Sequence, residues 1–506
     1  MSRSQSFWII FCLIVISIGL RTYDITVRSL WFDEAFSWRL IQFPVAEMIT
    51  RIQADVHPPL YYIVLKGWAY VFGSSVLALR SFSILCAVAS IVGAYIFTTY
   101  AFYSRRAGVL AAALLALSPW AISYATEARM YTLGMVFTLL SSYALLRAVR
   151  KPEAVWFGVY ALCISALAYT HYFGFFTIAS QGIFVAGTLI AMTKWRIGEI
   201  LQEKLFWGMS AALIGFFALY AVWIPTFLSQ RSQVEASYWV PDLSVHSVPD
   251  TLYKIIAPTA TEIRYRDGAA LISLLPLTLV LFVCLYLGIR YRRAEGVWLT
   301  LSLFVVPFLC AIGVSLVGRS IYNDRFLAFA GIFLFIIAAR AIDSISSIRV
   351  RLPVFGFVVF GLIGSFLSYR NELDIGNRPG AQSAVAHAFN MRAPGEKVIV
   401  SSPYVFFPVL HYAKERFGAA DSVVLYSTSD SFSHFSGAPI LRQEDVVYER
   451  DVAAYTGRVW VVETTGFSGK PFEAPAGWQE LSRKVFREVF VYQGDIIVRE
   501  FSIKPL

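Results

Sequence analysis

Long apolar runs constrain this chain more than any other feature of its sequence. We interpret eleven of them as membrane-spanning helices, because a helix that crosses a bilayer needs about 20 predominantly apolar residues. They lie near residues 7–22, 81–103, 108–123, 130–148, 155–170, 172–192, 206–225, 269–289, 297–317, 326–340 and 353–369. Charged residues make up only 15% of the chain, whereas soluble domains carry roughly 25%. The sequence therefore predicts a polytopic α-helical membrane protein with about 11 transmembrane helices.

A further apolar run, at 58–72, is too short to cross a bilayer easily. It carries Lys66 in its middle and is rich in tyrosine and tryptophan. These features are typical of an amphipathic helix that lies in the membrane interface. We therefore predict interfacial helical structure within a long first external loop at about 23–80.

The positions of the cations predict the orientation. When 58–72 is not counted as a span, the basic clusters at 105–106, 147–151 and 290–293 fall on one side of the membrane. This side is cytoplasmic by the positive-inside rule. We expect a multi-pass protein of the cell inner (cytoplasmic) membrane, with a cytoplasmic N-terminus and an extracytoplasmic C-terminal domain. The formal net charge of +10 then reflects topology, and nucleic acid is not an expected partner.

The first apolar run resembles a signal peptide. No small-x-small cleavage site follows it, and the chain continues with Arg21-Thr22-Tyr23-Asp24. We therefore expect an uncleaved first span. All five cysteines fall inside apolar runs, where neither a disulfide framework nor a zinc site is indicated. Nothing in the sequence indicates an organic cofactor.

The polar tail after residue 370 predicts a second domain. Its patterns are typical of strands at 397–401, 423–426 and 459–462, of a helix at 405–417, and of a closing hairpin at 485–503 around Gly494. We expect a transmembrane module at 1–370 and a small extracytoplasmic α/β domain at 371–506. Roughly 130 residues are enough for such a domain to hold its own core.

One short stretch interrupts the apolar pattern just after the first span. Leu30-Trp31-Phe32-Asp33-Glu34-Ala35-Phe36-Ser37-Trp38 places two adjacent carboxylates among aromatic residues. Neighbouring acids repel, and burial against aromatic rings raises the cost of ionising both. Such a pair persists most readily if a cation, a metal ion or a reacting hydroxyl compensates it. The alternative is a pair of loop acids that faces water.

Other unexpected polar groups fall on the same predicted external face. They are Asp55, His57, Glu127, Arg129, His171 and Arg325. A carboxylate beside a hydroxyl can act as a general base, arginines bind phosphate oxygens through paired hydrogen bonds, and Asp with His can hold a divalent metal. A phosphate-linked lipid substrate needs such groups at the bilayer edge.

Each of these groups also has a structural explanation. Asp55 can cap the helix that follows it. Glu127 and Arg129, wedged between two spans, can form a snorkelling pair at the interface. His171 can be a satisfied histidine at a helix end, and Arg325 can pair with the adjacent aspartate.

Four stretches of the chain carry a resemblance to a known class of proteins. They are Leu30-Trp31-Phe32-Asp33-Glu34-Ala35, His57-Pro58-Pro59-Leu60-Tyr61-Tyr62, Glu127-Ala128-Arg129-Met130-Tyr131 and Thr170-His171-Tyr172. Through them the chain resembles the GT-C membrane glycosyltransferases over about residues 5–340. In particular it resembles the bacterial glycosyltransferase family 39, related to protein O-mannosyltransferases and lipid A aminoarabinose transferases.

The resemblance implies an inverting glycosyltransferase of the bacterial cell envelope. Such enzymes move a sugar, here hexosyl or pentosyl, from a polyprenyl-phosphate donor to a glycan, lipid or protein acceptor on the outer face of the membrane. It implies that Asp33 is the catalytic carboxylate, with Glu34 beside it. The substrate-binding candidates that it implies are His57, Tyr61, Glu127, Arg129, Tyr131, His171, Tyr172 and Arg325, the last as the ligand of the lipid phosphate.

Whether a divalent metal takes part stays open at this point. The resemblance makes Asp55, His57 and His171 the candidate ligands, but their spacing does not decide the matter. Two other functions are alternatives: a polytopic transporter or lipid flippase with an external binding domain, and a scaffold that holds partners through its C-terminal domain. Transporters tend to show inverted repeats, and the sequence shows no internal repeat.

Overall fold

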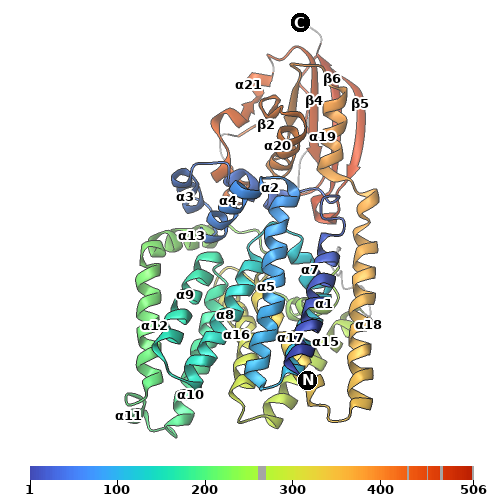
Figure 1. Ribbon diagram of the computed structural model, residues 1–506. Helices are drawn as coiled ribbons and strands as arrows, with labels where there is room; N and C mark the ends of the chain where they lie inside the picture. The colour runs from blue at the N-terminus through green and yellow to red at the C-terminus, as the bar shows by residue number, and fades with distance from the viewer. Residues whose placement is uncertain (260–268, 430–431, 453, 468–470, 504–506) are drawn as a thin grey trace.

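A helical bundle carries a small β-sheet at one of its ends in the computed structural model (Figure 1). The structure describes residues 1–259, 269–429, 432–452, 454–467 and 471–503. We call the end of the bundle that carries the sheet the sheet end. The other end, where α5 (Val76–Phe102) turns into α6 (Arg105–Leu117), is the opposite end.

The predicted apolar runs fold into helices. The remaining bundle helices are α1 (Arg3–Thr22), α7 (Pro119–Ala125), α8 (Tyr131–Arg150), α9 (Ala154–Thr170), α10 (Gly174–Met192), α12 (Lys204–Tyr220), α13 (Ile224–Ala236), α15 (Ala269–Arg290), α16 (Glu295–Val317), α17 (Ala328–Ser344) and α18 (Ile348–Leu373). Each of the eleven runs falls on one of them, with two exceptions: the run at 108–123 is divided between α6 and α7, and the run at 206–225 passes from α12 through a 3₁₀ turn (Ala221–Trp223) into α13. Ser118 caps α7 and Pro119 occupies its first turn, a position where proline starts a new helix.

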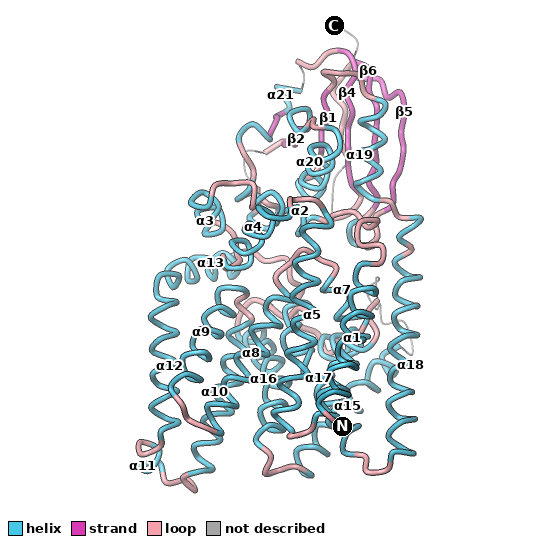
Figure 2. Tube along the Cα trace, viewed as in Figure 1, coloured by secondary structure: helices cyan, strands magenta, loops and turns pink. Residues whose placement is uncertain are grey.

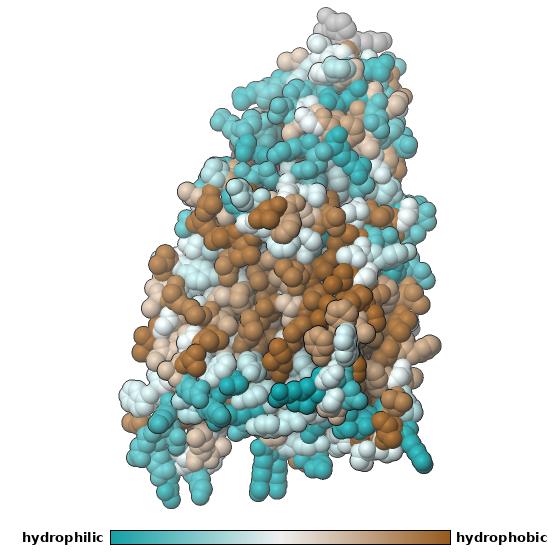
Figure 3. All heavy atoms as spheres, in the orientation of Figure 1, coloured by the Kyte–Doolittle hydropathy of each residue, from teal (hydrophilic) through white to brown (hydrophobic). Residues whose placement is uncertain are grey.

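Eight helices of the described chain are long and apolar enough to cross a membrane, and a ninth results if the bent pair α6–α7 is one span. The two members of that pair meet at 63°. Since α9 has only 17 residues, the number eleven stays a prediction. The polytopic membrane architecture itself is confirmed, and Figure 3 shows a wide hydrophobic belt between two hydrophilic ends.

The first long loop forms three short helices at the sheet end (Figure 1). They are α2 (Phe32–Leu40), α3 (Val45–Gln53) and α4 (Leu60–Phe72). With 13 residues, α4 is too short to span, as predicted. The Nζ of Lys66 donates hydrogen bonds to the carbonyls of Ile41 and Phe43, at 2.8 and 2.9 Å. The lysine is thus held by loop backbone and does not enter the lipid.

The C-terminal region is an α/β structure, in agreement with its sequence pattern (Figure 2). Its helices α19 (Gly380–Met391), α20 (Pro403–Phe417) and α21 (Glu449–Val452) accompany six strands in the order β3-β2-β1-β4-β6-β5. The strands are β1 (Lys397–Val400), β2 (Val423–Ser427), β3 (Val446–Tyr448), β4 (Gly457–Thr464), β5 (Trp478–Arg487) and β6 (Asp495–Ile503). The first four pair in parallel, and β6 is antiparallel to both of its neighbours. The predicted hairpin exists, but its first strand begins at Trp478.

The sheet domain is packed directly onto α2 and α3. Asp445 forms a buried ion pair of 2.7 Å with Arg39, and the hydroxyl of Tyr412 accepts a hydrogen bond of 2.8 Å from the backbone of Leu30. One hydrophobic cluster runs from the bundle through α2 into α20. A second, smaller cluster covers the other face of the sheet. The boundary at 370/371 stays a prediction, and the two parts share a core.

Candidate active site

Asp33 and Glu34 lie in the first turn of α2, where acids are favoured by the helix dipole. Successive side chains of a helix point about 100° apart, so the two carboxylates enter different surroundings. Glu34 is fully buried. Its oxygens accept two hydrogen bonds from Arg80, at 2.8 and 2.6 Å, and one of 2.8 Å from the backbone of Ala128. Burial raises the pKa of Glu34, but the charge and hydrogen bonds of Arg80 outweigh it and hold that pKa below its usual value.

Arg80 connects Glu34 to the loop before α2. Its guanidinium donates to the carbonyls of Ile25, Arg28 and Ser29. A buried ion pair with further hydrogen bonds of this kind fixes the backbone around it. The role of this pair is to position α2, and Glu34 has no surface open to a substrate.

Asp33 is the exposed member of the acid pair. Its side chain is 27% exposed, and Oδ2 lies 3.9 Å from Nε of Arg129 and 3.7 Å from Nη1 of Arg325. No described residue donates a hydrogen bond to this carboxylate. Asp33 is therefore held by charge between two guanidinium groups, with its oxygens available to a ligand.

Arg325 joins Asp33 to Glu127. In the 3₁₀ turn η2 (Asp324–Leu327), the side chain of Asn323 accepts a hydrogen bond from the backbone of Arg325 and so fixes the turn. Nη2 of Arg325 donates to both oxygens of Glu127, at 3.1 and 3.0 Å, and the guanidinium lies 4.4 Å from the ring centre of Trp31. The alternative pairing with Asp324 is not found, because that aspartate lies 3.6 Å from Lys254.

Arg129 joins Asp33 to His57. Its Nη2 lies 3.1 Å from Nε2 of His57, and Nδ1 of the same ring lies 2.7 Å from Oδ2 of Asp55. Because a guanidinium can only donate, Nε2 is the acceptor and Nδ1 carries the proton that is shared with Asp55. Nη1 of Arg129 also lies 3.3 Å from the hydroxyl of Tyr62. The guanidinium is thus clamped beside Asp33, while its buried Nε has no hydrogen-bond partner among the described residues.

Two further predicted site residues, Tyr131 and His171, adjoin this cluster of charged side chains. The ring of Tyr131 lies 5.9 Å from the guanidinium of Arg325 and 6.0 Å from the ring of His171. Nδ1 of His171 accepts a hydrogen bond from the backbone of Phe173. Burial lowers the pKa of His171 most, and the positive charge of Arg129 lowers it further, so this imidazole is neutral.

Tyr61 and Tyr172 form no hydrogen bond with the charged groups among the described residues. Tyr61 is fully buried against the rings of Tyr62 and Phe82. The hydroxyl of Tyr172 bonds Gln230 of α13, whose Nε2 donates to the carbonyl of Ile52 at 2.7 Å. Tyr172 therefore supports the segment that leads to Asp55.

The predicted metal ligands do not form a common site. Within the described chain, no group of three or more His, Cys, Asp or Glu side chains is arranged to hold a metal ion. Asp55 and His57 bind each other, and His171 faces aromatic rings. We therefore assign no step of the chemistry to a metal at these residues.

The structure adds participants that the sequence analysis did not select. They are Trp31, Tyr62, Arg80 and Tyr492. The first two stand inside stretches that carried the resemblance, and Arg80 ends a weaker match to the same class, Phe72-Gly73 followed by Ala78-Leu79-Arg80. No motif in the sequence pointed to Tyr492, because it lies in the C-terminal domain, outside the stretches that carried the resemblance.

Tyr492 brings the sheet domain to the cluster. Its ring meets that of Trp31 edge to face at 6.3 Å. The residue is nevertheless 43% exposed. It therefore borders the open side of the site.

Comparisons with known proteins identify the fold that carries these residues. The family model of dolichyl-phosphate-mannose-protein mannosyltransferase matches residues 56–223. The solved structure of ArnT from Cupriavidus metallidurans bound to undecaprenyl phosphate is similar with a TM-score of 0.59 and 12% identity, over 97% of each chain. The apo state of that protein gives a TM-score of 0.61 and 11% identity, over 98% of each chain. The chain has the GT-C fold.

A third GT-C structure is similar over less of its length. The apo oligosaccharyltransferase of Archaeoglobus fulgidus gives a TM-score of 0.51 and 10% identity, over 92% of this chain and 70% of that one. None of the curated proteins matches the sequence. The similarity to the ArnT structures includes the sheet domain, since it covers nearly the whole of this GT-C chain.

Proposed function

We propose that this GT-C chain transfers a sugar from a polyprenyl-phosphate donor to an acceptor at the sheet end of the bundle. The observation that carries the proposal is the partly exposed carboxylate of Asp33 between two guanidinium groups, in α2 at the sheet end of the bundle. The ArnT structure with undecaprenyl phosphate supports a polyprenyl phosphate as the class of ligand.

The chemistry is a single displacement at the anomeric carbon. An acceptor hydroxyl forms a new C–O bond on one face of the sugar, while the bond to the lipid phosphate breaks on the opposite face, so the configuration inverts. Asp33 accepts the proton of the hydroxyl as general base. If the acceptor is itself a phosphate anion, no base is needed and Asp33 orients the acceptor.

The arginines stabilise the charge that develops on the leaving phosphate. Arg325 uses only Nη2 for its hydrogen bonds to Glu127, so its other N–H groups remain available. Donors that are oriented in advance stabilise a developing oxyanion strongly, and planar guanidinium groups match phosphate oxygens. Glu127 holds Arg325, and the Asp55–His57 pair holds Arg129 in the required orientation.

The proposal also specifies the orientation of the protein in the membrane. We place the sheet end on the extracytoplasmic side of the inner membrane, because the basic clusters lie in loops of the opposite end. A reporter enzyme that is active only outside the cytoplasm, fused after residue 506, would then be active. An inactive fusion with normal membrane insertion would reverse the assignment.

The direct test is transfer by purified full-length chain from radiolabelled polyprenyl-phosphate sugars to envelope acceptors. Asp33→Asn keeps the shape of the side chain but removes its basicity, and we expect transfer to fall by roughly 10²–10⁴-fold. Glu47→Gln, on exposed α3 of the same loop, is the matched control and should retain activity. Wild-type rates for Asp33→Asn would reject the assigned role, and failure of the wild type with every donor would reject the proposed reaction.

A further inference from the structure

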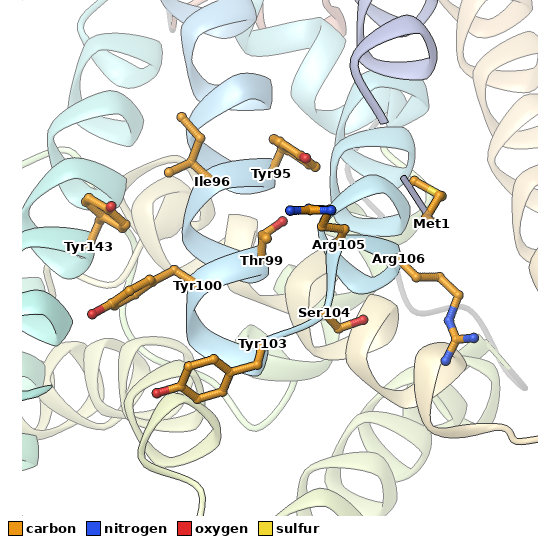
Figure 4. A pocket seen from close by; sticks show the side chains of 10 residues that line it. All are labelled: Met1, Tyr95, Ile96, Thr99, Tyr100, Tyr103, Ser104, Arg105, Arg106 and Tyr143. Atoms are coloured by element: carbon orange, nitrogen blue, oxygen red, sulfur yellow. The ribbon is translucent and has the colours of Figure 1, made fainter. Parts of the chain in front are cut away.

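A cavity lies at the opposite end of the bundle, away from Asp33. It encloses about 730 Å³, within the range of roughly 300–1,000 Å³ that is usual for ligand sites. Figure 4 shows its lining, which comes from α5, the turn into α6, and α8. The residues are Met1, Tyr95, Ile96, Thr99, Tyr100, Tyr103, Ser104, Arg105, Arg106 and Tyr143.

The lining is cationic. It contains two guanidinium groups and no carboxylate. Arg106 pairs with Asp343, which lies outside the lining and also binds Arg340. Arg105 extends from α6 toward α5 (Figure 4) and has no hydrogen-bond or ion-pair partner within the described ranges. An anion in this cavity would therefore meet a cation that has no internal partner.

Further arginines strengthen the positive charge at the rim. The guanidinium of Arg150 lies 4.7 Å from the ring centre of Tyr100 and 4.2 Å from that of Tyr103. The guanidinium of Arg147 lies 5.4 Å from the ring centre of Tyr100. Arg150 pairs with Glu295 and Arg106 with Asp343, so Arg105 and Arg147 supply the positive charge that no acid of the described chain balances.

The surroundings of the cavity favour a lipid over a soluble anion. Ile96 in the lining and Tyr103 at its rim are 44% and 78% exposed, and Figure 3 shows that the hydrophobic belt ends close to this hydrophilic end of the bundle. Tyrosine is enriched where acyl chains meet headgroups. Basic pockets between membrane helices bind the phosphate groups of lipids.

We propose that this cavity binds the phosphodiester headgroup of an anionic membrane lipid, in the leaflet that faces the opposite end. Arg105 is the main ligand of the phosphate, and the tyrosines contact the glycerol and the first part of the acyl chains. The site is separate from the transfer site and does not depend on the proposed reaction.

Native mass spectrometry of the full-length chain in neutral detergent tests this proposal. Added phosphatidylglycerol should remain bound, whereas phosphatidylcholine at the same concentration should not, and millimolar inorganic phosphate should not displace the bound lipid. Arg105→Gln should weaken phosphatidylglycerol binding roughly fivefold, since one cation near a charged lipid surface contributes a factor of that size. Arg105→Glu should weaken it further.

Arg349→Gln is the matched control, because Arg349 is an exposed arginine at the start of α18 on the same end. It should bind phosphatidylglycerol as the wild type does. Equal binding by Arg105→Gln and Arg349→Gln overturns the proposal. Equal binding of the zwitterionic lipid also overturns it, and displacement by inorganic phosphate reassigns the cavity to a soluble anion.

Discussion

Arginine and tyrosine gather at both ends of the bundle, and acids pair with some of these arginines at each end, but only at the sheet end do carboxylates line the candidate site itself. There, Arg325 is held by Asp33 and Glu127, and Arg80 by Glu34. At the opposite end, Arg105 lines a cavity whose lining contains no acid. Interleaved acids orient guanidinium groups and supply a base, which suits catalysis. Cations without acids suit the binding of an anionic surface.

The largest effect that we expect at the sheet end is on folding. Glu34→Ala leaves Arg80 buried without its acid, so the free energy of unfolding should fall by about 3–5 kcal/mol. Chemical unfolding in detergent measures this change, and Glu47→Ala, which removes an exposed acid of the same loop, should change it by less than about 1 kcal/mol. Replacing Arg80 by Met together with Glu34→Ala should recover part of the loss. Wild-type stability combined with lost transfer would instead make Glu34 a catalytic residue.

The second prediction concerns Arg325, the arginine of the sheet end to which we assign the leaving phosphate. Arg325→Ala should lower transfer by roughly 10²–10³-fold, because it removes donors from the leaving phosphate. Arg325→Lys should retain part of the rate, since the charge stays but the planar fork is lost. Arg231→Ala on exposed α13 is the control and should match the wild type. If Arg105→Gln impairs transfer as strongly as Arg325→Ala, the two ends do not have the separate functions that we propose.

The smallest effect should come from the sheet domain. Tyr492→Ala removes an aromatic face beside the site, and we expect the KM for the acceptor to rise roughly two- to tenfold with kcat little changed. Tyr492→Phe tests whether the hydroxyl matters, and Tyr448→Ala on β3 controls for general damage to the domain. If the KM for the acceptor stays unchanged, the only role of Tyr492 is to pack against Trp31.

Much of the fold could be predicted because it follows from local patterns. Apolar runs have no stable alternative to helices in lipid, and the strands β1, β2 and β4 were visible as short runs of β-branched residues. The grouping of Asp33, Glu127, Arg129 and Arg325 on one face followed from topology, since alternate loops emerge on the same side. The division between α6 and α7 was less accessible, because a single Pro119 redirects an otherwise continuous run.

The sequence by itself determined the apolar belt, the α/β tail and the face on which the polar groups emerge. Only the tertiary structure decided which of two adjacent acids is buried. Glu34 meets a cation 46 residues away, and Asp33 lies between guanidinium groups from loops much farther along the chain. The tertiary structure also brought Tyr492 of the sheet domain to the same cluster. Local patterns reflect burial and helix period, whereas the charge state and exposure of a carboxylate depend on partners that only folding brings within a few ångströms.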